Sequence, residues 1–329
     1  MNTRMQLGAL MAATALLWAL PVCAQFENRL EEKNIPVGVF NAVSATDNFE
    51  ITLESGACDV KVTADQQLSP YVQVYVRSKV LYITYDEKSV PKDIRKLYKG
   101  RNAPTPVFRV TVTLPELNGL YLSENVTVMC RDDFEAGRFD LTLSDKSQVK
   151  NLSVHAQSAT VSLRKNTQAV LDLSADNTLD LSAEGNANLR AEVSAKDLVL
   201  VPAGSSTLNI TARQVDNVTV RGAGSGKLLF AGDVERMDLQ GTASSSLGLS
   251  GTAGTLLIKA EKNVNVDGSA FQVQRLEADL SGSARADVNV SETLDATLVG
   301  GSALYYSGSP VFRIGKIVKS TLAPYGTTK

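Results

Sequence analysis

Few residues of this chain have the types and spacing that enzyme chemistry needs. The chain contains one histidine, His155, so any mechanism that needs two histidines is excluded. A Ser-His-Asp arrangement would have to use His155, and the sequence contains no Gly-x-Ser-x-Gly elbow. Zinc sites of the usual His/Cys kinds lack ligands for the same reason. We therefore predict no cofactor and no metal, and we interpret His155 as an ordinary strand residue.

Asp132 and Asp133 are the acidic pair that comes nearest to a polysaccharide-cleaving site. A hydrolase needs paired carboxylates, and a lyase needs carboxylates for calcium together with an Arg or Lys base. This pair has no such companions, and between residues 140 and 302 the only aromatic residues that could hold a sugar are Phe230 and Phe271. We predict that the chain is not an enzyme, with a lyase or hydrolase as the alternative.

A basic loop lies between residues 86 and 106. Ile94, Leu97 and Tyr98 have the spacing of one apolar helical face within it. One interpretation is a solvated loop with a short surface helix. The other is a docking patch for an anionic partner such as lipid head groups or an acidic glycan. The basic residues of this patch are Lys88, Lys92, Arg95, Lys96, Lys99 and Arg101.

Two cysteines, Cys58 and Cys130, follow the N-terminal segment that we expect to be removed. Each lies on an alternating apolar run and faces the same way as its aliphatic neighbours. They form either a disulfide, which an exported compartment permits, or two buried thiols that act as small hydrophobic side chains. A bridge between them would contribute about 4 kcal/mol in the loop-entropy model.

A repeat of about twenty residues determines where these candidate residues lie in the fold. Each repeat holds two short apolar alternations separated by small polar turns, and within each alternation the apolar residues recur at period two. The steps between successive markers are 18 to 22 residues. The markers are Leu122, Leu143, Leu163, Leu181, Leu200, Val220, Leu239, Ile258, Leu280 and Leu298.

This pattern predicts an all-β fold, a parallel β-helix of about ten turns. Strands this short bury a face only when they stack on the turns above and below. At roughly 4.8 Å per turn the rod would be about 48 Å long. Proline supports this prediction, because only Pro202 lies between residues 116 and 309, and a strand paired on both sides avoids proline. An antiparallel sandwich is the alternative.

The N-terminus predicts export. Residues 1–24 have a charged start at Arg4, an apolar run from Leu7 to Leu20 and a small-residue end, Val22-Cys23-Ala24, as in a secretory signal peptide. Later in the chain no run is apolar enough to span a membrane. We expect the protein in the periplasm, on the outer-membrane surface or secreted. Without the signal peptide, 32 basic and 35 acidic residues remain, so there is no general basic field for nucleic acid.

We divide the rest of the chain into four segments. Residues 25–37 are an N-terminal linker. Residues 38–118 are a β-rich cap or the first turns, and residues 119–314 are the parallel β-helix. Residues 315–329 are a loose tail. Whether residues 38–118 form a separate domain stays open.

Outward strand positions carry small polar side chains, which make a flat face capable of hydrogen bonding. This face either serves solubility alone or offers a broad, weak surface for a glycan or a protein. The outward residues include Asn209, Thr219, Asn265, Asp279, Asn289 and Thr297.

Several short motifs occur in an order that resembles a known family. Phe40-Asn41-Ala42-Val43 precedes the first strands, and Leu114-Pro115-Glu116-Leu117 leads into the repeats. Leu280-Ser281-Gly282-Ser283 is the clearest repeat motif, and residues 301–310 match Gly-x-Ala-x-Tyr-x-Gly-x-Pro with one extra residue. Over residues 38–315 the chain is similar to the head GIN domain of autotransporter adhesins, common in Bacteroidetes.

The resemblance implies a right-handed β-helix outside the inner membrane and brings no catalytic residues. The chain departs from the family at Ser144-Asp145-Lys146-Ser147, where a Ser-Gly-Ser turn is usual, and at residues 316–319, where a glycine-rich end is usual. We predict an exported, non-enzymatic, adhesin-like protein of the cell envelope that binds a cell-surface glycan or protein. The alternative is a structural or accessory periplasmic protein without a ligand. The oligomeric state is not predicted.

Overall fold

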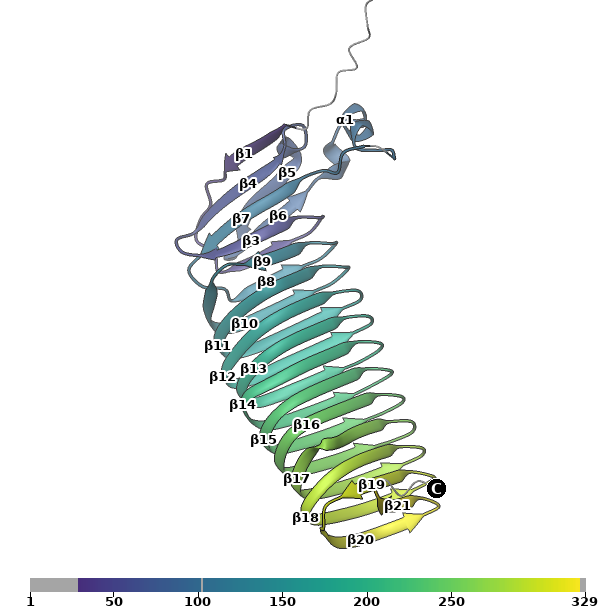
Figure 1. Cartoon of the computed structure of the whole chain (residues 1–329). Coiled ribbons are helices and arrows are strands. Elements are labelled where there is room, and N and C mark those ends of the chain that lie inside the picture. The colour runs from purple at the N-terminus through teal and green to yellow at the C-terminus, as the bar shows by residue number, and fades with distance from the viewer. Residues whose placement is uncertain (1–28, 102, 326–329) are drawn as a thin grey trace, which may run out of the picture.

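The computed structural model describes residues 29–101 and 103–325. The predicted signal peptide lies outside the described residues. The described chain is a β-solenoid of about 10 turns of stacked parallel strands, which confirms the predicted fold (Figure 1). Its regular turns are β10 (Asp133–Leu143), β11 (Gln148–Arg164), β12 (Gln168–Glu184), β13 (Asn188–Pro202), β14 (Thr207–Gly222), β15 (Lys227–Gly241), β16 (Ser246–Ala260), β17 (Asn265–Ser281) and β18 (Arg285–Val299).

Each turn is one long strand, not two short ones. The two alternations expected in each repeat join into a single strand that bends midway, and each strand pairs in parallel with the next. Leu181, Leu200 and Val220 follow one another in register and are fully buried. Because side chains alternate between the two faces of a strand, one set fills the core and the other faces solvent.

The tight turns between strands stack along one side of the rod. Their central residues have a positive φ: 72° at Gly185, 65° at Gly224 and 70° at Gly282. Side chains with a Cβ strain in this left-handed region, which is why glycine suits these turns. The departures noted above, such as Asp145 and Lys146, adopt the same conformation without glycine.

The N-terminal end combines first turns with an antiparallel cap. β2 pairs in parallel with β8, and β3 with β9, so the solenoid begins before residue 119. β6 and β7 stack outside β2 and β3, and β4 and β5 pair antiparallel to them. The elements are β1 (Leu30–Asn34), β2 (Ala42–Ala45), β3 (Glu50–Ser55), β4 (Asp59–Asp65), η1 (Ser69–Tyr71), β5 (Val72–Arg77), β6 (Val80–Tyr85), η2 (Glu87–Ser89), α1 (Lys92–Leu97), β7 (Phe108–Leu114), β8 (Gly119–Leu122) and β9 (Thr127–Cys130).

The C-terminal end has strands where a loose tail was expected. β19 (Ala303–Ser307), β20 (Val311–Val318) and β21 (Thr321–Pro324) form a last partial turn. The expectation fails because Gly315 is an extra residue in the ladder between Ile314 and Lys316, so the apolar alternation breaks there and resumes at Ile317. A bulge of this kind hides a strand from a strict period of two. The boundary drawn at residues 118 and 119 stays a proposal.

Candidate functional site

The basic loop forms the short helix α1 beside the first turns. Ile94 and Tyr98, four residues apart, pack against the hydrophobic core, as the predicted apolar face requires. Leu97, the third residue of that face, is exposed instead. Figure 1 shows α1 beside the outermost turns, on the side of the rod where the tight turns stack. The helix therefore roofs a space against the end of the sheet.

That space is a pocket of about 510 Å³, which we call the cap pocket. Its size is in the range of small-molecule sites. It combines aromatic side chains with charged and amide groups from segments that are distant in sequence. Its lining residues are Asp47, Asn48, Phe49, Glu50, Leu68, Tyr85, Glu87, Arg95, Tyr98, Lys99, Thr105, Pro106, Phe108, Asn125 and Thr127.

Aromatic rings form the inner wall of the cap pocket. The ring centroid of Phe108 lies 4.6 Å from that of Tyr85 and 5.4 Å from that of Phe49. Phe49 and Phe108 are buried, whereas Tyr85 and Tyr98 are half-buried. Burial raises the pKa of both tyrosines to about 12. Both hydroxyls therefore stay neutral at physiological pH and can donate hydrogen bonds.

The cap pocket is lined by two cations, Arg95 and Lys99, and by three acids, Asp47, Glu50 and Glu87. Arg95 and Lys99 form no ion pair with any described residue. Among the acids, Glu50 accepts a hydrogen bond of 3.1 Å from Arg109 Nε, and Asp47 accepts one of 3.2 Å from the backbone N–H of Tyr85. An anion that enters the pocket would thus meet two cations without a protein partner.

The structure separates the predicted basic patch into two groups. Arg95 and Lys99 line the cap pocket, and the other four side chains, Lys88, Lys92, Lys96 and Arg101, do not. These four are exposed. The sequence indicated the cations but not their aromatic partners, because Phe49, Tyr85 and Phe108 meet only through strand pairing of β3, β6 and β7 around the first turns.

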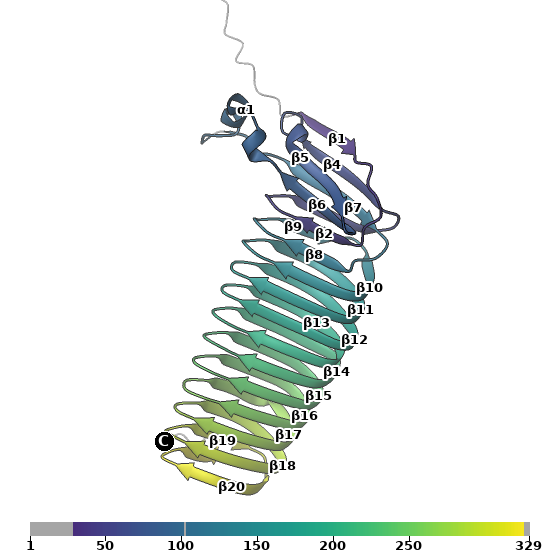
Figure 2. The same cartoon turned by 180° about the vertical axis from the view of Figure 1, so that it is seen from behind.

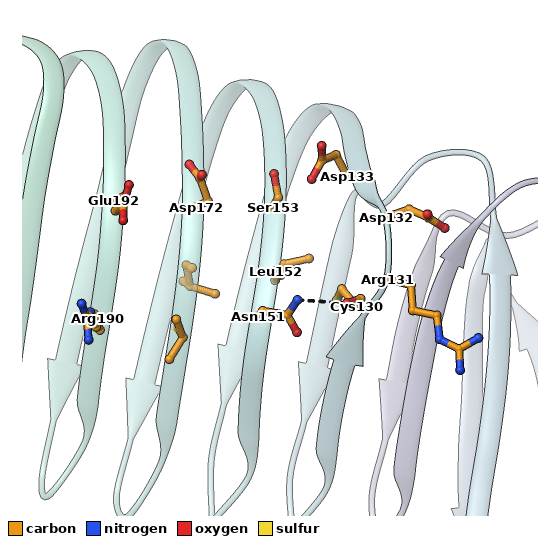
Figure 3. Close-up of a pocket in the computed structure, with 12 residues that line it drawn as sticks. Cys130, Arg131, Asp132, Asp133, Asn151, Leu152, Ser153, Asp172, Arg190 and Glu192 are labelled. Atoms are coloured by element: carbon orange, nitrogen blue, oxygen red, sulfur yellow. Dashed lines mark hydrogen bonds between the residues drawn. The ribbon is translucent and has the colours of Figure 1, made fainter.

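A second hollow of about 280 Å³ lies on the side of the rod around Cys130 (Figure 3). It contains Asp132 and Asp133, which point away from each other in Figure 3. Asp132 accepts a 2.8 Å hydrogen bond from the backbone N–H of Ser55. Although both residues line this hollow, their carboxylates do not face each other across it, as paired catalytic carboxylates do.

Other carboxylates near this hollow are held by one arginine. Ser153, Asp172 and Glu192 follow Asp133 in register along the ladder (Figure 3). The guanidinium of Arg213, the extra residue of a bulge in β14, binds Asp172 through two nitrogens at 3.1 and 2.9 Å and also binds Glu192. This clamp neutralises neighbouring acids and was not visible in the sequence, because a bulge has no fixed sequence mark.

His155 lies on the ladder with a serine and an aspartate. Its Nδ1 is 2.5 Å from Ser174 Oγ, and its Nε2 is 3.7 Å from Asp176 Oδ1. The side chain of Asp176 is 59% exposed, so water competes for it and it fixes the imidazole poorly. The backbone N–H of Ser174 belongs to a paired strand, which leaves it engaged in the ladder rather than aimed at an oxyanion.

Both cysteines are free thiols, so the structure does not support the bridge between them. Cys58 Sγ lies 3.4 Å from the carbonyl oxygen of Phe40, to which it donates. Cys130 ends β9 in register with Leu53, and burial raises its pKa to about 12. A thiol with this pKa is unreactive at neutral pH.

A family model described as "Putative auto-transporter adhesin, head GIN domain" matches residues 39–231 and 176–310. These two matches overlap and together cover most of the chain. The chain belongs to this family. The resemblance stated from its motifs is thereby confirmed. No curated protein matches the chain.

Solved structures of similar proteins come from related bacteria. A "putative adhesin" from Parabacteroides merdae has 16% identity and a TM-score of 0.37, covering 91% of this chain and 97% of that chain. A "putative lipid binding protein" from Parabacteroides distasonis has 14% identity and a TM-score of 0.37, with the same coverage. With TM-scores this low, these proteins add nothing to what the family shows.

Proposed function

We propose that this family member is an exported, non-enzymatic, adhesin-like protein that binds an acidic glycan in the cap pocket. The family description supports adhesion. Among the described residues no helix is long and apolar enough to cross a membrane. The observation that carries the proposal is the pairing of an aromatic wall with two cations that have no ion-pair partner, Arg95 and Lys99.

Both parts of this wall fit a sugar acid. The exposed side of an aromatic ring packs against the apolar C–H face of a sugar ring. Arg95 binds a carboxylate or sulfate through parallel N–H groups, and Lys99 adds a point charge. The neutral hydroxyl of Tyr85 and the amides of Asn48 and Asn125 supply hydrogen bonds to sugar hydroxyls. The outward polar face of the rod then serves solubility and spacing.

Glycan binding tests this proposal directly. The chain without residues 1–24 is applied to an array of acidic polysaccharides and their neutral counterparts. We expect binding to acidic members, reduced more than tenfold by an Arg95→Gln/Lys99→Gln variant. A Lys88→Gln/Lys96→Gln variant is the matched control, since it removes the same charge from the same loop outside the pocket.

The outcome distinguishes a site from a diffuse charge effect. Equal losses of glycan binding in the two double variants would mean that the glycan binds the basic surface in general and not the cap pocket. Binding to vesicles of anionic lipid, with no preference among the polysaccharides, would favour a lipid head group as the ligand. Failure to bind any of these probes would favour the structural protein without a ligand.

Export is tested on cells. Intact cells are labelled with an antibody against the chain, with permeabilised cells as the control. We expect label on intact cells. Label only after permeabilisation would place the rod in the periplasm and end the adhesin proposal.

Catalysis is tested by a screen on acidic and neutral polysaccharides with and without calcium. We expect no cleavage, because Asp132 accepts a hydrogen bond from the backbone N–H of Ser55, and Asp172 and Glu192 are bound by Arg213. Cleavage that disappears in an Asp132→Ala/Asp133→Ala variant would establish an enzyme instead.

A further inference from the structure

Strand β20, in the last turn of the solenoid, leaves an open sheet edge. One edge of β20 pairs with β18, and no described strand pairs with its other edge. At the opposite end the outer strands are β1 and β5. β1 is Leu-Glu-Glu-Lys-Asn, whose charges discourage pairing, and β5 is Val-Gln-Val-Tyr-Val-Arg, which alternates polar with apolar residues. β20 is Val-Phe-Arg-Ile-Gly-Lys-Ile-Val, an apolar strand with unpaired N–H and C=O groups. Such an edge is a template for another strand.

The hydrophobic core is also open at this end. Phe312, Ile314 and Ile317 stack over the buried Leu294, Ala296 and Leu298 of the previous turn. They are 42%, 45% and 41% exposed, respectively, because no strand within residues 29–101 and 103–325 covers them. Terminal repeats of solenoids normally present polar outer faces. An apolar end with three core positions uncovered marks an interaction surface.

The sequence of β20 reads almost the same in reverse. This near-symmetry indicates that the strand that pairs with its open edge is β20 of a second copy of the chain. In an antiparallel pair centred between Ile314 and Gly315, the strand meets a copy of itself with apolar residues opposite apolar residues. The opposed pairs are Val311 with Val318, Phe312 with Ile317, Arg313 with Lys316 and Ile314 with Gly315.

The bulge at Gly315 makes this pairing consistent with the two faces of the strand. Phe312 and Ile317 both lie over buried core positions, although they are five residues apart, because the extra residue shifts the alternation by one. The inward Phe312 thus meets the inward Ile317 of the copy, and Ile314 meets Gly315, which has no side chain. We propose that a second copy of this chain docks here, β20 against β20, about a two-fold axis perpendicular to the rod.

The charges on β20 determine whether added salt strengthens or weakens the dimer. Arg313 and Lys316 face each other across the pair, and like charges directly opposite are unfavourable. Asp295 lies beside Arg313 in register on β18 and offsets only part of this repulsion. Added salt screens the remainder, so the dimer tightens as ionic strength rises.

Molar mass in solution tests the proposal. The chain without residues 1–24 is analysed by sedimentation equilibrium over a wide range of concentration. We expect a dimer, and half that mass for Phe312→Asp and for Ile317→Asp. Leu229→Asp is the matched control, because Leu229 is an exposed apolar residue, 54% exposed, in the middle of the rod. Circular dichroism checks that each variant is folded.

A cross-link tests the register independently of those variants. In a Val311→Cys/Val318→Cys chain with Cys58→Ser, the new thiols of one chain are about 23 Å apart along the strand. Across the antiparallel pair their Cα atoms are about 4.5–5.5 Å apart, which a disulfide spans. We expect a covalent dimer on a non-reducing gel. A monomeric wild type, assemblies that grow beyond a dimer, or no cross-link would each overturn the proposal.

Discussion

Tight turns with a positive φ show what single residues contribute to this rod. Ala243 and Gly282 occupy equivalent turns, with φ values of 63° and 70°. Alanine in the left-handed region costs about 1 kcal/mol or more, whereas glycine adopts it freely. A Cβ added at Gly282 would also lie 3.0 Å from the backbone of Lys262.

We therefore expect opposite effects at these two turns. Ala243→Gly should stabilise the fold by about 0.5–1 kcal/mol, the gain being reduced by the greater freedom of glycine in the unfolded chain. Gly282→Ala should destabilise it by about 1–2 kcal/mol. Urea unfolding measures both. The same sign for the two variants would contradict this account of the turns.

The raised pKa of Glu124 predicts that the stability of the fold depends on pH. The side chain of Asp47, by hydrogen bond and then by charge, raises the pKa of Glu124 above its ordinary value. A carboxyl with a raised folded-state pKa stabilises the fold at pH values below its unfolded pKa, and this contribution is lost as the pH rises through the folded pKa. At neutral pH the two carboxylates repel each other.

Glu124→Gln removes this repulsion and retains a hydrogen-bond donor toward Asp47. We expect a higher melting temperature than wild type at pH 7 and no difference at about pH 3, where the glutamic acid is protonated in both states. Thermal melts across this range measure it. A constant difference at every pH would mean that titration of Glu124 is not the cause.

At the scale of elements, α1 is the part on which the cap pocket depends. The helix has six residues and is too short to be stable alone, so its packing through Ile94 and Tyr98 holds it in place. Arg95 lies in α1, and Lys99 follows its last residue by two positions. Detachment of the helix therefore removes both cations from the pocket.

Ile94→Asp should detach α1 without unfolding the rod. We expect faster hydrogen exchange for residues 90–101, an unchanged melting temperature, and the same loss of glycan binding as Arg95→Gln/Lys99→Gln. Leu97→Asp is the control, since Leu97 lies on the same helix and is exposed. Rapid exchange in wild type already would show that the helix does not roof the pocket.

At the scale of the whole molecule, stability comes from one continuous column of core side chains. Leu200 is fully buried between its neighbours in adjacent turns, whereas Leu229 faces solvent. Leu200→Ala should cost about 2–5 kcal/mol because it leaves a cavity. Leu229→Ala should change the free energy of unfolding by less than about 0.5 kcal/mol. Denaturant unfolding compares them, and similar costs would refute the assigned faces.

The view from behind shows the same stack of turns, with the N-terminal cap at one end and the turn that contains β20 at the other (Figure 2). Both proposed binding surfaces lie at these ends. The interior turns have no free backbone edge, because each strand pairs on both sides. In a regular solenoid, partners that add strands can bind only at the termini.

The sequence by itself determined the rod. Period-two alternation within a twenty-residue step, from Leu122 to Leu298, favours stacked parallel strands over an antiparallel sandwich, because each short strand buries its apolar face only against the turns above and below. The same rule predicted strands in residues 38–118, but not that β6 and β7 stack outside β2 and β3, since the order of pairing leaves no mark on alternation.

Only the tertiary structure revealed the two surfaces that we propose as binding sites. The cap pocket joins Phe49, Tyr85 and Phe108 with cations of a loop, and these meet through long-range pairing that no local pattern encodes. The open end at β20 depends on Gly315, whose bulge turns an apparent tail into a strand with its core face exposed. Local patterns fix which face of a strand is buried, whereas the neighbours of each strand, present or missing, decide which surfaces remain open to a partner.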